Sequence, residues 1–158
     1  MNESRPRITL LGIGNPLCRD DGIGIYVIQE IQTSGSYAGV DIIDGGTSPD
    51  LLSLVDANID KLIIVDALRG GGEPGSVYRL EIDESHMADD IPASLHGLGV
   101  LDHLKMMKKL GIEPHKVVII GVEPLDTSHG LQLSKEIQSR IPEIMVTIEE
   151  EIKDNLLK

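Results

Sequence analysis

The sequence predicts a single α/β domain with a mostly parallel five-stranded sheet, one antiparallel edge strand and helices on both faces. Three observations predict it. Four short apolar runs rich in Ile, Leu and Val alternate with stretches of helical periodicity, those runs end at carboxylates or glycines, and a fifth run alternates apolar with polar residues. Parallel strands need crossover helices, and 158 residues suffice for one ordinary domain spanning residues 1–158.

The chain is organised around its first strand and the turn that follows it, residues 7–24, with the sequence RITLLGIGNPLCRDDGIG. Residues 7–11 are mostly apolar and include the β-branched Ile8 and Thr9, which is typical of a strand buried on both faces. Two glycines end the run, and the acidic pair Asp20 and Asp21 stands where a helix should begin. Asp21 is therefore expected at the carboxyl end of the first strand, where open α/β sheets keep their sites.

Two further predicted strands also end at an aspartate. Residues 40–43 form the second strand, which stops at Asp44 before two glycines, and residues 61–65 form the third, which stops at Asp66. Between them, Ser48-Pro49-Asp50 predicts a helix start, with Ser48 as N-cap and proline at the first helical position.

The second half of the chain continues the alternation. The sequence VYRLEI predicts a half-exposed edge strand, and KVVIIGV predicts a buried fifth strand that ends at Glu123. The elements expected around them are an acidic loop at 83–94, a helix from Leu98 to Lys109 capped by Gly111, and a helical region from Ser134 broken or kinked at Pro142. Four carboxylates, Asp21, Asp44, Asp66 and Glu123, then lie along one sheet edge, with His96 at a helix start.

Composition narrows the possible partners. Acidic residues outnumber basic ones 26 to 14, and the net charge of −12 disfavours nucleic acid and anionic membranes as partners. There is no Phe or Trp, so an aromatic platform for stacking bases is hard to build. A single cysteine excludes an internal disulfide, and no apolar run approaches the length of a membrane span. We expect a cytoplasmic protein without membrane insertion.

Asp21, Asp66 and His96 form a candidate metal site. Two carboxylates and an imidazole suit borderline divalent ions better than calcium. The alternative is that the acids cap helices or bind loop amides and that His96 is a polar loop residue. Position favours the metal site, because each candidate follows a buried strand or opens a helix. The sequence contains neither an HExxH motif nor paired CxxC motifs, so it does not indicate a self-contained zinc peptidase.

Two other kinds of site have weaker support in the sequence. Gly12-Ile13-Gly14 resembles the start of a dinucleotide fingerprint, but Leu17 occupies the position of the third glycine. Cys18 could act as a thiol nucleophile with His96 as its base. The simpler interpretation is that Cys18 is a small apolar loop residue.

Six segments in order resemble the endopeptidases that mature the large subunit of nickel-iron hydrogenases. These segments are GIGNPLCRDDGIG, DGGT at 44–47, LIIVDAL at 62–68, SLHGLG at 94–99, GVEP at 121–124 and HGLQLS at 129–134. The resemblance implies a three-layer α/β/α sandwich and metal contacts at Asp21, Asp66 and His96. It also implies that Asp44 helps to recognise or cleave the substrate, so the expected catalytic carboxylates are Asp21, Asp44 and Asp66.

Such endopeptidases remove a carboxyl-terminal peptide from the hydrogenase large-subunit precursor after nickel insertion. The resemblance therefore implies that precursor as partner, with nickel carried by the substrate and no metal tightly held by the chain itself. An incomplete ligand set could test for nickel by letting the precursor complete it. The metal could polarise the scissile carbonyl or activate water, with a carboxylate as general base, and the aspartic-protease label stays open.

Three rival functions share some of these features. A phosphoacceptor receiver domain also has an acidic pair after the first strand and an aspartate after the third. Such a domain has a lysine at the end of its fifth strand, however, and this sequence has Glu123 there. A nickel-sensing chaperone would bind the same precursor without cutting it. A hydrolase with its own metal would retain that metal through purification.

Overall fold

The computed structural model describes residues 5–35, 37–47, 49–83 and 99–156. The strands are β1 (Ile8–Gly12), β2 (Val40–Asp44), β3 (Lys61–Ala67), β4 (Val77–Ile82) and β5 (Lys116–Val122). The helices are the 3-10 helix η1 (Arg19–Gly22) and the α-helices α1 (Ile23–Ser34), α2 (Leu51–Leu54), α4 (Val100–Lys109), α5 (Lys135–Gln138) and α6 (Ile141–Leu156). None of the helices in this part of the chain is long and apolar enough to cross a membrane.

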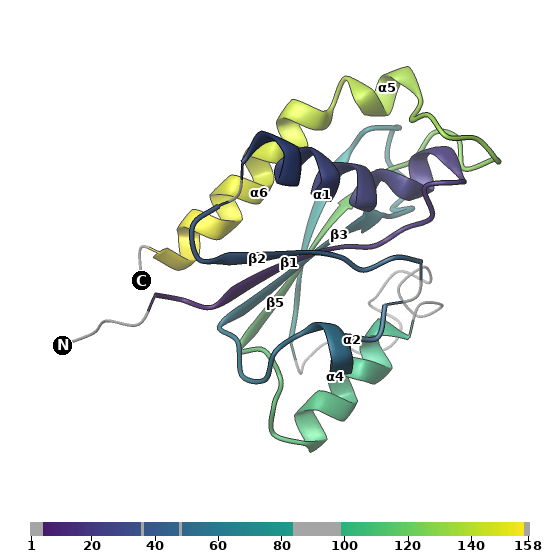
Figure 1. The fold of residues 1–158 in the computed structure, drawn as a ribbon. Helices are drawn as coiled ribbons and strands as arrows, with labels where there is room; N and C mark the ends of the chain where they lie inside the picture. Colours follow the sequence, from purple (N-terminus) through teal and green to yellow (C-terminus); the bar gives the residue numbers. More distant parts are fainter. Residues whose placement is uncertain (1–4, 36, 48, 84–98, 157–158) are drawn as a thin grey trace.

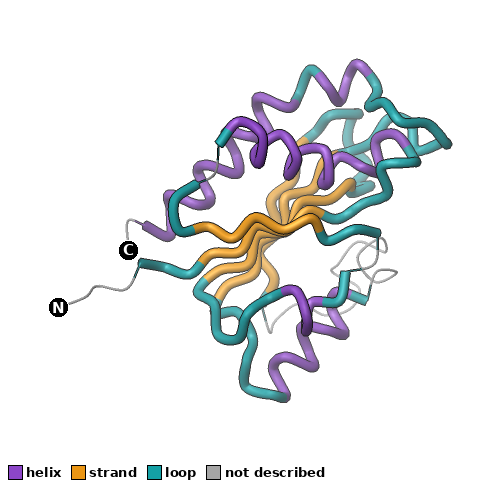
Figure 2. Tube along the Cα trace, in the orientation of Figure 1, coloured by secondary structure: helices purple, strands orange, loops and turns teal. Residues whose placement is uncertain are grey.

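The five strands form one sheet in the order β2-β1-β3-β5-β4. The first four of these strands are parallel, and β4 pairs antiparallel with β5 at the edge, which confirms the predicted sheet. Figure 1 shows α1, α5 and α6 on one face and α2 and α4 on the other, so the domain has three layers. In Figure 2 the strands, drawn in orange, lie between the two layers of helices.

The larger core lies between the sheet and helices α1 and α6. Its residues are aliphatic and buried, and they include Leu10, Ile63 and Val65 from the strands and Ile28 and Ile148 from the helices. Helix α1 approaches the sheet closely because it carries Gly24 at the contact. A Cβ there would lie 2.2 Å from the Val65 carbonyl oxygen and 2.4 Å from that of Ile13.

The second core lies between the opposite sheet face and helices α2 and α4. Helix α2 is a single turn, and its N-cap is Asp50, whose carboxylate accepts a hydrogen bond from the Leu52 amide at 3.1 Å. The predicted helix start at Ser48 was therefore wrong, because Asp50 supplies the capping oxygen and lies in extended backbone. The Nδ1 atom of His103 in α4 accepts a hydrogen bond from the Leu51 amide at 3.2 Å, which joins the two helices.

Two other predicted elements have different bounds in the structure. Strand β3 continues two residues past Val65, to Ala67, so Asp66 lies inside the strand rather than after it. The helical region after Ser134 is two helices, and Pro142 lies in the first turn of α6, where its missing N–H costs nothing. The C-terminal cap at Gly111 was correct, with φ of 71° and an amide bonded to the Lys108 carbonyl. Most of the loop predicted at 83–94 lies outside the described residues.

An ionic cluster with Lys61 and Glu151 buried at its centre holds α6 against the start of β3. The Lys61 side chain is fully buried, and its Nζ lies 2.8 Å from Glu151 Oε1 and donates to the Glu151 carbonyl at 2.7 Å. Arg79 of β4 adds a two-pronged contact to the same carboxylate, with both nitrogen–oxygen distances at 2.7 Å. These cations lower the pKa of Glu151 to about 2, with the Arg79 bonds as the largest cause and burial opposing them.

Candidate functional site

The candidate site lies where the parallel strands end. Gly12, the last residue of β1, is level with Asp44 of β2 on one side and with Val65 of β3 on the other. Because parallel strands share one direction, the residues that end them gather at one edge, where loops continue from the strands in Figure 2. The predicted placement of Asp44 and Asp66 at this edge was correct.

Asp66 is a buried carboxyl group at this edge, with 3% of its surface exposed. Its Oδ1 accepts a hydrogen bond from the Ala67 amide at 2.8 Å. Burial raises the pKa of Asp66 to about 8, the Ala67 hydrogen bond opposes the rise, and the negative charge of Asp21 adds to it. Asp66 therefore holds a proton at neutral pH, and a carboxyl group of this kind is a candidate for chemistry.

Asp21 lies in the 3-10 helix η1, which packs against β3, the strand that contains Asp66. The Asp21 side chain is half-buried, and its Oδ2 accepts a hydrogen bond from the Asn15 amide at 3.1 Å. The turn is tight, because Gly14 has φ of 151° and a Cβ there would lie 2.1 Å from the Asp21 carbonyl oxygen. The glycine turn thus permits the close approach of η1 to the end of β1, and it explains the GIGN sequence without a nucleotide.

Asp44 and Glu123 occupy the edge in different ways. Asp44 is exposed, and its Oδ1 accepts a hydrogen bond from the Gly46 amide at 2.9 Å. Strand β1 separates β2 from β3, so the backbones of these two strands are about 10 Å apart. Glu123 is buried, and its two carboxylate oxygens accept the amides of Gly70 and Gly71 at 2.9 and 3.1 Å. Glu123 therefore fixes the glycine-rich loop, a role that its position after a strand did not reveal.

His96 lies outside the described residues, so the expected triad of Asp21, Asp66 and His96 stays a prediction. The same holds for the pairing of Cys18 with His96. Within the described ranges, the imidazole beside Cys18 is that of His129, with Nδ1 3.9 Å from Sγ. No group of three or more His, Cys, Asp or Glu side chains placed to hold a metal ion occurs among the residues that the structure describes.

Asp20 is a residue that sequence reasoning left without a role. Only 1% of its surface is exposed, and its carboxylate accepts bonds from the amides of Leu125, Asp126 and Ser134 and from the Ser134 hydroxyl. The two neighbouring acids therefore differ, since Asp20 binds within the protein and Asp21 lies near Asp66. The acidic pair in the sequence was the only signal for Asp20, and it did not say which acid would be buried.

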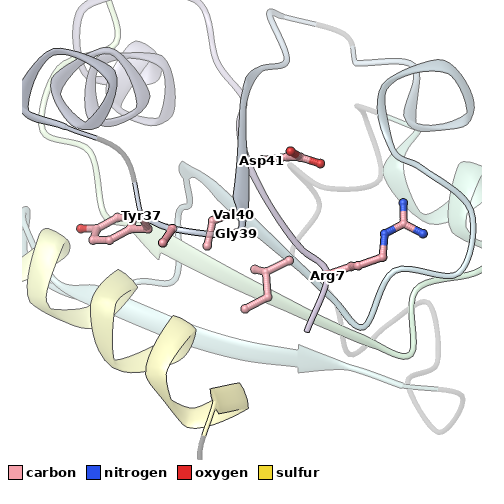
Figure 3. Close-up of a pocket in the computed structure, with 7 residues that line it drawn as sticks. Arg7, Tyr37, Gly39, Val40 and Asp41 are labelled. Atoms are coloured by element: carbon pink, nitrogen blue, oxygen red, sulfur yellow. The ribbon is translucent and has the colours of Figure 1, made fainter. Parts of the chain in front are cut away.

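The pocket in Figure 3 lies at the other end of the sheet. It has a volume of about 410 Å³, and its lining includes Arg7 at the start of β1 and Val40 and Asp41 of β2. The Arg7 guanidinium already donates to Asp56 at 3.2 Å. This pocket is separate from the carboxylates at the carboxyl edge, and it brings together none of the predicted site residues.

Comparisons with known proteins agree with the resemblance seen in the sequence. The hydrogenase maturation protease family matches residues 25–151. A putative hydrogenase maturation protease of Methanocaldococcus jannaschii is 32% identical over 151 residues, which cover 92% of this chain and 96% of that protein. The hydrogenase 2 maturation protease of Escherichia coli is 31% identical over 137 residues, covering 85% of this chain and 84% of the relative.

A solved structure supports the same assignment. The hydrogenase maturating endopeptidase HybD of E. coli superposes with a TM-score of 0.77 and 26% identity, covering 94% of this chain and 93% of that one. The three-layer fold expected from the resemblance is thereby confirmed. The chain belongs to the hydrogenase maturation protease family.

Proposed function

We propose that this peptidase removes the carboxyl-terminal peptide of a nickel-iron hydrogenase large-subunit precursor, and that the nickel in the precursor is its recognition element. The observation that carries the proposal is the pair formed by Asp66 and Asp21. A buried carboxyl group with a pKa of about 8 beside a second carboxylate is costly to keep, and active sites are where such pairs are found. Family membership supplies the reaction class.

The protonated state of Asp66 offers a way to sense the metal. A carboxyl group must lose its proton before it can bind a metal ion, so metal binding and proton release are coupled. A nickel-loaded precursor brings positive charge to Asp66, which favours the carboxylate, and the proton leaves to solvent. A nickel-free precursor leaves Asp66 protonated and the contact unmade, and this difference supports selectivity for the loaded precursor.

The remaining residues take roles that suit their positions. Asn15 occupies Oδ2 of Asp21 and leaves Oδ1 to contact the substrate metal or to accept a proton from the attacking water. His96 is the third contact to the substrate metal in this proposal. Asp44 is exposed two strands away from Asp66 and is suited to contact the precursor chain beside the scissile bond. The protein itself then needs no tightly held metal.

The experiment is the mass of a precursor after incubation with a catalytic amount of the protein, with the precursor nickel-loaded or nickel-free. We expect loss of a short carboxyl-terminal peptide from the loaded form only. Asp21→Asn should abolish this processing, whereas Asp41→Asn, an exposed aspartate in the amino half of β2, should process normally.

Three outcomes would contradict the proposal. Binding of loaded precursor without any change of mass would favour the nickel-sensing chaperone, which acts stoichiometrically. Stoichiometric nickel that survives chelation and dialysis of the isolated protein would favour a hydrolase with its own metal. Processing of both precursor forms at equal rates would remove nickel as the recognition element.

A further inference from the structure

The buried carboxylate of Asp20 joins two parts of the chain that both border the candidate site. Its Oδ2 accepts hydrogen bonds from the Leu125 amide at 3.0 Å, the Asp126 amide at 2.9 Å and the Ser134 hydroxyl at 2.7 Å. Its Oδ1 accepts the Ser134 amide at 2.8 Å. One side chain in η1 therefore fixes both ends of the segment 125–134.

The backbone adds a second connection between the same two segments. The Arg19 amide donates to the Gly130 carbonyl at 3.0 Å, and the Gly130 amide donates to the Leu17 carbonyl at 2.9 Å. The Asp20 amide donates to the Asp126 carbonyl at 3.0 Å. Segment 125–134 and the start of η1 are thus bonded at their middle and at both ends, which makes them one unit.

This arrangement determines where the next residue can point. Successive side chains of a 3-10 helix are about 120° apart around its axis, so the direction of Asp20 sets that of Asp21. Asp20 is directed into segment 125–134, and the adjacent Asp21 lies in a helix that packs against β3, the strand that contains Asp66. The η1 helix has little room to adjust, because a Cβ at Gly22 would lie 2.6 Å from the Pro16 Cα.

We infer that Asp20 is a positioning residue for the peptidase, one that holds the Asp21 carboxylate in place beside Asp66 through its four hydrogen bonds to segment 125–134. This inference rests on the proposed function, because it assigns Asp21 to the reaction. Asp20 itself is buried and touches no substrate.

An asparagine at this position does not reproduce the four bonds. An amide has one accepting oxygen, and its NH₂ group would face donors, either the Ser134 amide or the amides of Leu125 and Asp126. Two donors then oppose each other, and η1 must turn or shift to separate them. The side chains have nearly the same size, so Asp20→Asn tests the hydrogen bonds rather than the volume of the residue.

The first measurement is the kinetics of precursor processing by Asp20→Asn. Displacement of a catalytic group by about 1 Å reduces rates on the order of 100-fold, so we expect kcat to fall by about that factor with KM nearly unchanged. Ser134→Ala removes one of the four bonds and should lower kcat by a smaller factor. Asp41→Asn is the charge-matched control and should behave as the wild type.

A purely structural role predicts a different result. If Asp20 only stabilised the fold, the loss of activity would equal the fraction of unfolded protein and would disappear at temperatures where the variant is fully folded. Unchanged kcat in fully folded Asp20→Asn would overturn the inference. If Asp20→Asn does not fold, Ser134→Ala decides, and a wild-type kcat in that variant overturns it.

A second measurement does not depend on the activity. The Asn15 amide donates to Asp21 Oδ2, so its NMR resonance reports the position of the Asp21 carboxylate. We expect that resonance to shift in Asp20→Asn and Ser134→Ala and to stay in place in Asp41→Asn. If the wild-type protein does not process the precursor, the proposed function fails, and the Asn15 resonance alone decides whether Asp20 positions Asp21. An unshifted resonance in folded Asp20→Asn refutes the positioning role.

Discussion

Replacing Asp66 with asparagine should make the protein more stable at alkaline pH while it removes processing activity. The amide keeps an oxygen for the Ala67 N–H, which donates to Asp66 Oδ1 at 2.8 Å, and it keeps the size of the side chain. What it removes is the negative charge that forms in a site with 3% exposure when the carboxyl group loses its proton.

The magnitude follows from the raised pKa of Asp66. That pKa is about 8 in the folded protein, with burial as the main cause, against an ordinary value of 3.8 that the unfolded chain should approach. Between these values the folded state binds the extra proton, so the free energy of unfolding falls as pH rises. Integrated from pH 6 to pH 9, the loss is about 3 kcal/mol, and most of it occurs below pH 8.

The assay is urea unfolding of the wild type and Asp66→Asn at pH 6, 7, 8 and 9. Other groups titrate in both proteins and cancel in the difference, so the variant should gain about 3 kcal/mol relative to wild type between pH 6 and pH 9. Asp41→Asn, which removes an exposed carboxylate, should show no such change across this range. A difference between wild type and Asp66→Asn that is constant with pH would refute the raised pKa and the metal-for-proton exchange built on it.

Two further predictions concern stability. Glu151→Gln leaves the fully buried Lys61 without a counter-charge, so we expect a loss of about 3–5 kcal/mol in denaturant unfolding at pH 7. The pKa of Glu151 is lowered to about 2, so the wild type should lose this stabilisation as pH falls from about 4.5 towards 2. A Glu151→Gln variant as stable as the wild type at pH 7 would contradict both statements. Gly24→Ala places a methyl group 2.2 Å from the Val65 carbonyl oxygen and should cost about 3 kcal/mol or more; an unchanged melting temperature would show that α1 can move away from the sheet.

The elements were predictable because their signals are local. The apolar run of β5, the alternating pattern of β4 and the glycine after α4 each depend on a few consecutive residues. The prediction of Ser48 as the N-cap failed because serine and aspartate are both common N-cap residues, and the local sequence does not choose between Ser48 and Asp50. Figure 1 shows the resulting layers in the arrangement expected from the alternation of strands and helices.

The sequence by itself determined the mostly parallel sheet, its antiparallel edge strand and the acids at its carboxyl edge, because strand direction places successive strand ends together. The tertiary structure decided what each acid does. Asp20 binds Ser134, which is 114 residues away, and Glu123 binds Gly70, 53 residues away. Burial and hydrogen bonding depend on such distant segments, so the local sequence does not show them. They distinguish an acid that stabilises the fold, such as Asp20, from Asp66, whose pKa is raised to about 8.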